Sequence, residues 1–103
     1  MLDETSQELI NFLELIADIR SKSNFDFSDS PIKIHKVGPK FIRLAEFRPN
    51  DDGILEARTC YCFVERATGD IYKGSWKAPV KNGRRGHISS IKGMGVYGPD
   101  YLR

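Results

Sequence analysis

The residues best suited to chemistry lie together in the last third of the chain, at positions 76–87. This segment holds the only tryptophan, two lysines, two adjacent arginines between glycines, and a histidine. Glycines let backbone amides approach an anionic group closely, and guanidinium groups match phosphate oxygens in two-point contacts. Trp76, with Tyr72 and Tyr61 on neighbouring strands, would offer ring faces on which bases stack. The segment favours a surface for single-stranded nucleic acid, or a pocket for a nucleotide.

The residues predicted to contact nucleic acid are basic or aromatic and lie between positions 72 and 92: Tyr72, Lys73, Trp76, Lys77, Lys81, Arg84, Arg85 and Lys92. The competing interpretation is structural. In it the tryptophan is a core residue, the lysines are solvated, and the two arginines form ion pairs with acidic residues elsewhere in the protein or in a second subunit. A Gly83-x-x-Gly86 loop with basic residues also occurs in one RNA-binding module. That module places the loop between two helices, whereas here it follows strands.

Cys60 and Cys62 are the only cysteines and form a C-x-C pattern inside an apolar run. On a strand their side chains would share one face, and Tyr61 would point to the other. Tetrahedral zinc needs four ligands, and a disulfide across one intervening residue would be strained. We expect buried thiols that behave as small hydrophobic side chains.

Other catalytic or metal-binding patterns are weak. His35 and His87 are possible bases for a cysteine nucleophile, but no spacing rule joins these residues. Asp51 and Asp52 could bind a metal, yet they lie in a turn where such residues are expected for backbone reasons. The sequence therefore favours a protein that is not an enzyme, with no catalytic residues, no metal and no cofactor.

Charge is distributed unevenly along the chain although the total is only +2. Residues 1–30 carry seven acidic groups against two basic groups, a net charge of −5. Residues 72–103 carry seven basic groups against Asp100 alone, a net charge of +6. Surfaces of opposite charge on one chain make association between copies plausible, so a homo-oligomer is one expected form.

We expect a single domain, residues 1–103. In it a helix and a sheet, whose apolar residues recur with different periods, would position these groups. Residues 5–21 are predicted to form a helix, with Thr5 and Glu8 as a capping box. Its apolar stripe needs a cover, either the domain's own sheet or a partner chain. The stripe has three- to four-residue spacing and includes Leu9, Phe12, Leu13, Ile16 and Ala17.

From position 31 the apolar period changes to two, which predicts an antiparallel meander over residues 31–75. Residues 76–103 are rich in Gly, Lys and Arg and are expected to form an ordered segment. The predicted fold class is α+β. An N-terminal helix packs on a sheet of about three to five antiparallel strands, followed by the ordered Gly-rich C-terminal segment.

The last part of the chain resembles small uncharacterised proteins of bacteriophages. The resemblance rests on GDIYKGSWKAP at positions 69–79, on Arg85-Gly86-His87-Ile88, and on VYGPDYL at positions 96–102. It implies a phage or virus source and carries no assigned activity. The Tyr97-Gly98-Pro99 element and the Ser-Trp-Lys-Ala-Pro element at positions 75–79 suggest a tail folded back onto the sheet.

The function expected from these observations is that of a phage-type accessory protein that binds nucleic acid, single-stranded and with low sequence specificity. Two alternatives stay open: a protein-interaction module, such as a virion component or an inhibitor of a host protein, and a sequestering pocket for a phosphorylated small ligand. The acidic start of the chain and the lack of a run of roughly 18 apolar residues predict no membrane partner. We expect a cytoplasmic location, in the host cell if the protein is phage-encoded.

Overall fold

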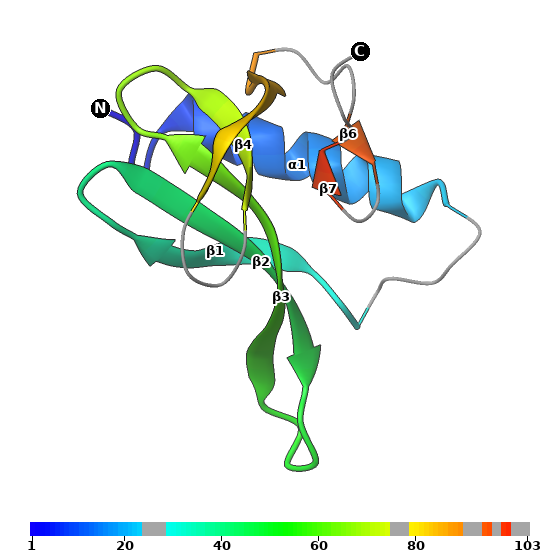
Figure 1. The fold of residues 1–103 in the computed structure, drawn as a ribbon. Coiled ribbons are helices and arrows are strands. Elements are labelled where there is room, and N and C mark those ends of the chain that lie inside the picture. Colours follow the sequence, from blue (N-terminus) through cyan, green and yellow to red (C-terminus); the bar gives the residue numbers. More distant parts are fainter. Residues whose placement is uncertain (24–28, 75–78, 90–93, 96–97, 100–103) are drawn as a thin grey trace.

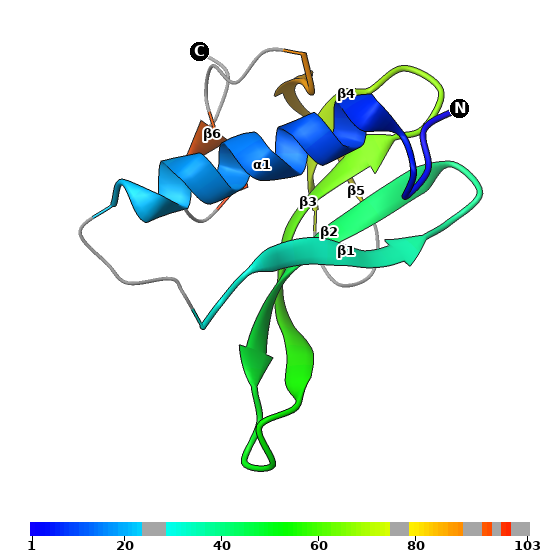
Figure 2. The same ribbon diagram turned by 180° about the vertical axis from the view of Figure 1, so that it is seen from behind.

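An antiparallel sheet with a helix on one face forms the body of the protein. The computed structural model describes residues 1–23, 29–74, 79–89, 94–95 and 98–99. Within them, one five-stranded sheet has its strands in chain order, and a second sheet has two. Helix α1 lies across one face of the larger sheet (Figures 1 and 2), so the expected α+β class is confirmed. The elements are α1 (Gln7–Ser21), β1 (Ile32–Val37), β2 (Phe41–Pro49), β3 (Leu55–Glu65), β4 (Asp70–Gly74), β5 (Pro79–His87), β6 (Met94–Gly95) and β7 (Gly98–Pro99).

The sheet continues beyond the predicted meander. Residues 79–87, expected to belong to the Gly-rich segment, form β5 at the edge of the sheet and pair with β4. An edge strand tolerates proline and glycine because one side of its backbone needs no partner. The pairing of β4 with β5 also shifts register twice. Such a strand lacks the regular alternation by which strands are detected in a sequence.

The helix begins two residues later than predicted, because Thr5 is hydrogen-bonded to Asp3 ahead of the first turn. Its carboxylate Oδ1 accepts from the amide of Thr5 at 2.8 Å and from the Thr5 hydroxyl at 2.6 Å. Ser6 is the N-cap residue, and its hydroxyl oxygen accepts the amide of Asp3 at 2.9 Å instead of capping the helix. The predicted Thr5–Glu8 capping box is therefore wrong, since Ser6 is the N-cap residue and the amide of Thr5 donates to Asp3 instead of Glu8.

The core lies between α1 and the sheet. Leu9, Phe12 and Ile16 form the buried stripe of the helix, each at most 1% exposed. They pack in one cluster with side chains of the facing strands. Burying such side chains is the main favourable term in folding, roughly 1.5–3 kcal/mol for each large apolar group. The strand residues of this cluster are Ile42, Leu44, Tyr61, Cys62, Val64 and Ile71.

Irregular pairing in the β2–β3 hairpin changes which side chains lie on each face of the sheet, and it also bends the hairpin. The register shifts between Leu44 and Ala45, so that β3 holds one extra residue there, Tyr61. Tyr61 consequently lies in the core cluster beside Cys62, and the prediction that it points to the opposite face is wrong. A second shift follows between Glu46 and Phe47. Bulges bend and twist the strand that carries them.

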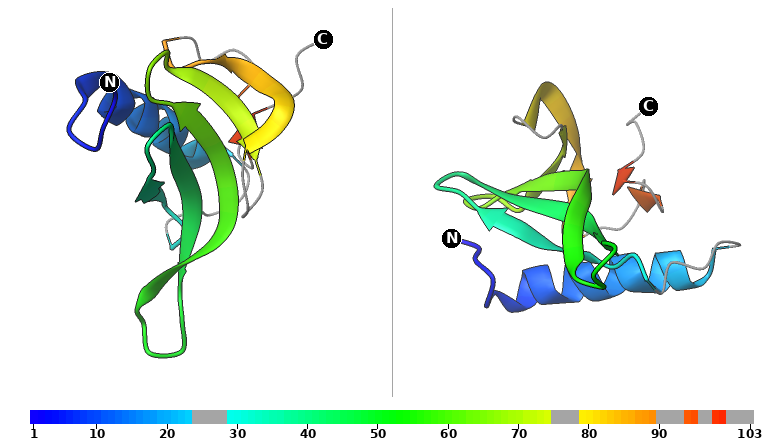
Figure 3. Two further views of the ribbon diagram at one scale, coloured as in Figure 1. Left: turned by 60° about the vertical axis from the view of Figure 1, so that its left-hand side comes forward. Right: turned by 90° about the horizontal axis from the view of Figure 1, so that it is seen from below.

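Beyond these shifts the hairpin projects away from the body. Residues 47–57, which we call the hairpin arm, pair with each other and extend as a two-stranded ribbon (Figures 1 and 3). At the base of the arm the amide of Phe47 also donates to the carbonyl of Pro31 at 2.9 Å. The arm ends in a turn at residues 50–54, with Pro49 opposite Leu55. This shape places the arm's tip far from the helix-covered sheet.

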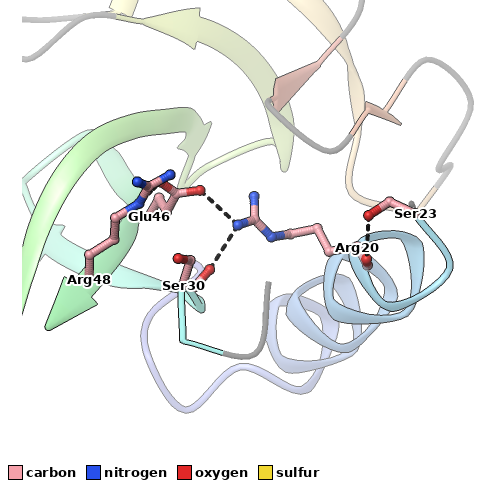
Figure 4. A network of polar contacts seen from close by, with 5 residues as sticks. All are labelled: Arg20, Ser23, Ser30, Glu46 and Arg48. Carbon is pink, nitrogen blue, oxygen red and sulfur yellow. Dashed lines mark hydrogen bonds and ion pairs between the residues drawn. The ribbon is translucent and has the colours of Figure 1, made fainter. Parts of the chain in front are cut away.

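A buried ion pair fastens the last turn of α1 to the sheet (Figure 4). Arg20 Nη2 lies 2.7 Å from Glu46 Oε2 on β2 and donates a second hydrogen bond, of 2.8 Å, to the carbonyl of Ser30. The two ionic side chains are only 4% and 8% exposed. Arg48 Nε donates to the other carboxylate oxygen at 2.8 Å. Both oxygens of the buried carboxylate therefore have charged donors, which offsets the loss of water.

Candidate functional site

One row of side chains crosses the face of the sheet opposite α1, which we call the open face. Residues that face each other in neighbouring strands project to the same side of a sheet. Lys36 pairs with Arg43, Arg43 with Phe63, and Phe63 with Tyr72. Their neighbours in the strands, such as Ile42, Val64 and Ile71, lie in the core under the helix. Basic and aromatic residues therefore alternate with core residues and gather on the open face.

An aromatic cluster forms the centre of this row. The ring of Phe41 meets the rings of Phe63 and Tyr72 edge to face, with centroids 6.1 and 5.5 Å apart. This arrangement suits the ring quadrupoles and fixes the three rings relative to one another. Phe63 is 5% exposed and forms the floor, whereas Phe41 and Tyr72 are half-buried. The last two are the rings that a ligand can reach.

Cations surround the aromatic cluster. Lys40 Nζ lies 5.5 Å from the centroid of the Phe41 ring, and the Arg43 guanidinium carbon lies 5.2 Å from that of Phe63. Both distances fall in the range of cation–π attraction. An ion pair at this edge joins Lys40 Nζ to Glu65 Oε2 at 3.8 Å, and the Lys40 side chain is 69% exposed. So loose and exposed a pair leaves the lysine able to meet another anion.

These groups line a shallow pocket of about 210 Å³ at the β1–β2 turn, which we call the basic–aromatic pocket. Its lining residues are Lys36, Gly38, Pro39, Lys40, Phe41, Arg43 and Phe63. Three of them are cationic, two are aromatic and none of these described residues is acidic. Positive charge beside the half-buried ring of Phe41 suits a phosphorylated ligand that also carries a planar group.

The residues predicted from the sequence are only partly described. Tyr72 lies in the aromatic cluster, and Lys73 beside it on β4 is half-buried. Arg84 faces Tyr72 from β5, which extends the row by one strand at the level of the backbone. Lys81 and Arg85 also lie on β5, with the strand but not their side chains described. Trp76, Lys77 and Lys92 lie outside the described residues.

Sequence reasoning missed the residues of the pocket itself. A signal was present in the strand at positions 41–47, where Phe41 and Arg43 alternate with Ile42 and Leu44. With the apolar pair assigned to the core, the other two residues must share the open face. Tyr61, by contrast, was expected to offer a stacking face and is 4% exposed within the core. That part of the predicted site is wrong because the bulge turns Tyr61 inward.

The cysteines are both free, Cys62 buried and Cys60 half-buried. Burial raises the pKa of the Cys60 thiol, an effect that the nearby Arg43 guanidinium partly offsets. Complete burial raises the pKa of the Cys62 thiol well above its ordinary value, and the neighbouring Cys60 adds to that rise. Thiols that hold their proton are weak nucleophiles and weak metal ligands.

The histidines and the aspartate pair have local structural contacts. The amide of Ser89 donates to His87 Nδ1 at 3.1 Å, so the ring's Nε2–H donates to the carbonyl of Thr68 at 2.6 Å. His35 packs edge to face against Phe47. The amide of Asp52 donates to the side-chain oxygen of Asn50, two residues earlier in the turn, at 2.9 Å. In the described ranges, no group of His, Cys, Asp and Glu is arranged to hold a metal ion.

The chain belongs to DUF7717, a family of unknown function, whose model matches residues 3–96. This confirms the expectation of an uncharacterised family and carries no activity with it. No curated protein and no solved structure matches the chain. In the part of the chain that the structure describes, no helix is long and apolar enough to cross a membrane.

Proposed function

We propose that this member of the family binds single-stranded nucleic acid, with low sequence specificity, through the basic–aromatic pocket and the row that continues from it. The observation that carries the proposal is that Lys36, Lys40 and Arg43 line one pocket with the rings of Phe41 and Phe63, on the face opposite α1. Phosphates would meet the cations, and a base would stack on the half-buried ring. A single-stranded ligand supplies both groups at once.

The direction of the row suggests how a strand would lie. The row runs from Lys36 on β1 across Arg43, Phe63 and Tyr72 to the backbone position of Arg84 on β5. With strands about 4.8 Å apart, this path is about 19 Å long and crosses the strands. A short stretch of nucleic acid would follow it, and β5 would add its basic residues at the far end.

Low sequence specificity follows from the kind of contact. Phosphate contacts and stacking accept any base, because every nucleotide has a phosphate and every base has a π-face. Reading a base needs polar groups aimed at its edge. The cations of the pocket are assigned to phosphates, and its described lining holds no amide side chain, whose paired donor and acceptor would suit such an edge.

The role as a phage accessory protein is part of the same proposal and rests on the resemblance of the C-terminal pattern to bacteriophage proteins. It implies action in the cytoplasm of a host cell. The gene neighbourhoods of family members are the direct test. We expect phage replication or structural genes beside them, and neighbours that belong only to ordinary cellular operons would contradict this part of the proposal.

Fluorescence anisotropy with labelled oligonucleotides tests the binding, with two lysines as a matched pair. Lys40 is 69% exposed and pairs with one carboxylate, and Lys22, the C-cap residue of α1, is 74% exposed and also pairs with one. Lys40→Gln should weaken binding and flatten the plot of log K against log salt by about 0.7, the value for one phosphate contact of a single strand. Lys22→Gln should change neither quantity.

Stacking is tested by Phe41→Ala, after circular dichroism has shown that the variant is folded. Loss of one base–ring contact is worth about 1–3 kcal/mol, or roughly 5- to 150-fold in affinity. Duplex of the same sequence should bind more weakly, since its bases are already stacked. A salt-independent affinity, or equal effects of the two lysine variants, would refute the proposal. If a mononucleotide competes as well as the oligonucleotide, the ligand is a small phosphorylated molecule instead.

A further inference from the structure

The tip of the hairpin arm carries acidic and apolar side chains, whereas the basic–aromatic pocket carries cations. Ile54 is 62% exposed and Leu55 is 40% exposed, although large apolar side chains are normally favoured inside. Asp51 and Asp52 are exposed beside them. Glu56 follows on β3, with Arg58 only loosely paired to it at 3.9 Å. The tip thus presents an apolar knob flanked by carboxylates.

This tip is held in one conformation by its own turn. Asn50 Oδ1 accepts from the amides of Asp52 and Ile54 at 2.9 and 3.0 Å. The amide of Asn50 donates to the carbonyl of Ile54 at 2.8 Å, and its side-chain amide donates to Glu56 at 2.9 Å. Gly53 supplies the positive φ, 79°, that the turn requires. A rigid turn presents the apolar knob without a further ordering cost on binding.

We propose that the tip of one molecule inserts into the basic–aromatic pocket of a second copy of this chain. The apolar knob would lie against the ring of Phe41, and the carboxylates of Asp51 and Asp52 would meet Lys36 and Lys40. Complementary charge and apolar character on two surfaces of one chain carry the inference. It does not depend on the proposed nucleic-acid function, because a protein surface supplies the anionic groups here.

The geometry requires two copies. The pocket is at the start of β2 and the tip lies beyond its end, so both belong to opposite ends of the same hairpin. Nine strand residues, Phe41–Pro49, separate them by about 27 Å at about 3.4 Å per residue. A tip therefore cannot enter its own pocket. Such contacts either are reciprocal and close a two-fold dimer, or run head-to-tail and add further copies until a ring closes.

The contact is small, so the association should be weak and should depend on protein concentration. Sedimentation velocity at low salt should show the weight-average mass rising with concentration, and added salt should reverse the rise because exposed charges are screened. The exposed tip residues can be changed without touching the core. Asp51→Lys with Asp52→Lys should lower the association constant about tenfold or more, since like charges would then meet.

A charge exchange is the decisive experiment. The tip variant carries lysine at positions 51 and 52, and the pocket variant carries Lys36→Glu with Lys40→Glu. Each alone should stay monomeric, because tip and pocket then have the same sign. An equimolar mixture should associate again, since each tip now meets a pocket of opposite charge. Lys22→Glu, a charge reversal at the C-cap of α1, serves as the control and should associate like the wild type.

Three results would overturn the proposal: a mixture that stays monomeric although circular dichroism shows both variants folded, a pocket variant that associates as the wild type does, or a wild type that is monomeric at every concentration. The second would mean that two arms pair with each other. Failure here is distinct from failure of nucleic-acid binding. Ile54→Ser should abolish association and leave oligonucleotide affinity unchanged at dilutions where the wild type is monomeric.

Discussion

Replacing Glu46 with alanine should destabilise this protein more than any change at its surface ion pairs. The substitution leaves the Arg20 guanidinium, only 4% exposed, without the carboxylate that lies 2.7 Å away. Removing one partner of a buried pair costs about 3–5 kcal/mol, because the remaining charge stays out of water. Domains of this size have total stabilities of about 5–15 kcal/mol, so the loss is a large share. The melting temperature should fall by more than about 12 °C.

Urea titrations followed by circular dichroism measure this loss, and the chain contains its own control. Asp18 and Lys22 form an ion pair of 2.9 Å in which the lysine and aspartate side chains are 74% and 55% exposed. Asp18→Ala should cost less than about 0.5 kcal/mol, since exposed pairs are weakened by water and by side-chain entropy. Salt should reduce the small effect of Asp18→Ala and leave the large effect of Glu46→Ala nearly unchanged.

A double variant separates the charge from the packing. Arg20→Met with Glu46→Leu removes both charges and keeps similar volume, and such replacements of buried pairs are often neutral or stabilising. Most of the stability lost in Glu46→Ala should therefore return, while Arg48, more than half exposed, can be solvated without its partner. If Glu46→Ala proves as mild as Asp18→Ala, the end of α1 is not held by this pair and the reasoning fails.

Two further predictions concern groups outside the pocket. Iodoacetamide should modify Cys60 slowly at neutral pH and Cys62 more slowly still, because their raised pKa values leave little thiolate; both rates should climb as pH rises toward those values. Mass spectrometry of the alkylated peptides reads the order, and equal rates would contradict it. Gly53 and Gly69 share a φ of 79°, so alanine at either strains the backbone by roughly 1–2 kcal/mol. At Gly69 the new Cβ would also lie 2.8 Å from His87 Nε2, so Gly69→Ala should lose more free energy of unfolding in urea titrations; equal losses would show that His87 yields without cost.

Periodicity in the sequence was enough to predict the helix and the first strands. A three- to four-residue spacing placed Leu9, Phe12 and Ile16 on one helical face, and the structure buries all three. Leu13 and Ala17, predicted in the same stripe, are half-buried and exposed. The glycine turn after β3 likewise joins two paired strands. These features depend on neighbours within one turn or one strand, so local pattern contains the information that defines them.

Features that depend on pairing between strands were not predictable in this way. The bulge that turns Tyr61 into the core exists only relative to β2, and no local property of β3 announces it. β5 has an edge position that relaxes the usual alternation. The pocket combines Lys36 and Phe41 with Phe63, residues brought together by the register of three strands. The net charge along the sequence predicted a site in the last third of the chain. The cations that line the described pocket are instead brought together by the pairing of the strands.

The two faces of the sheet differ in how their charged side chains are paired. On the helix side, the buried carboxylate of Glu46 on β2 forms an ion pair with Arg20, so a charged group of the sheet holds the end of α1. On the open face, the lysines of the pocket are exposed and make at most loose ion pairs among the described residues. Changing Lys36 or Lys40 should therefore alter ligand affinity and self-association with little change in the free energy of unfolding. Because nucleic acid and the hairpin tip would occupy the same pocket, an oligonucleotide that binds there should also disperse the assemblies.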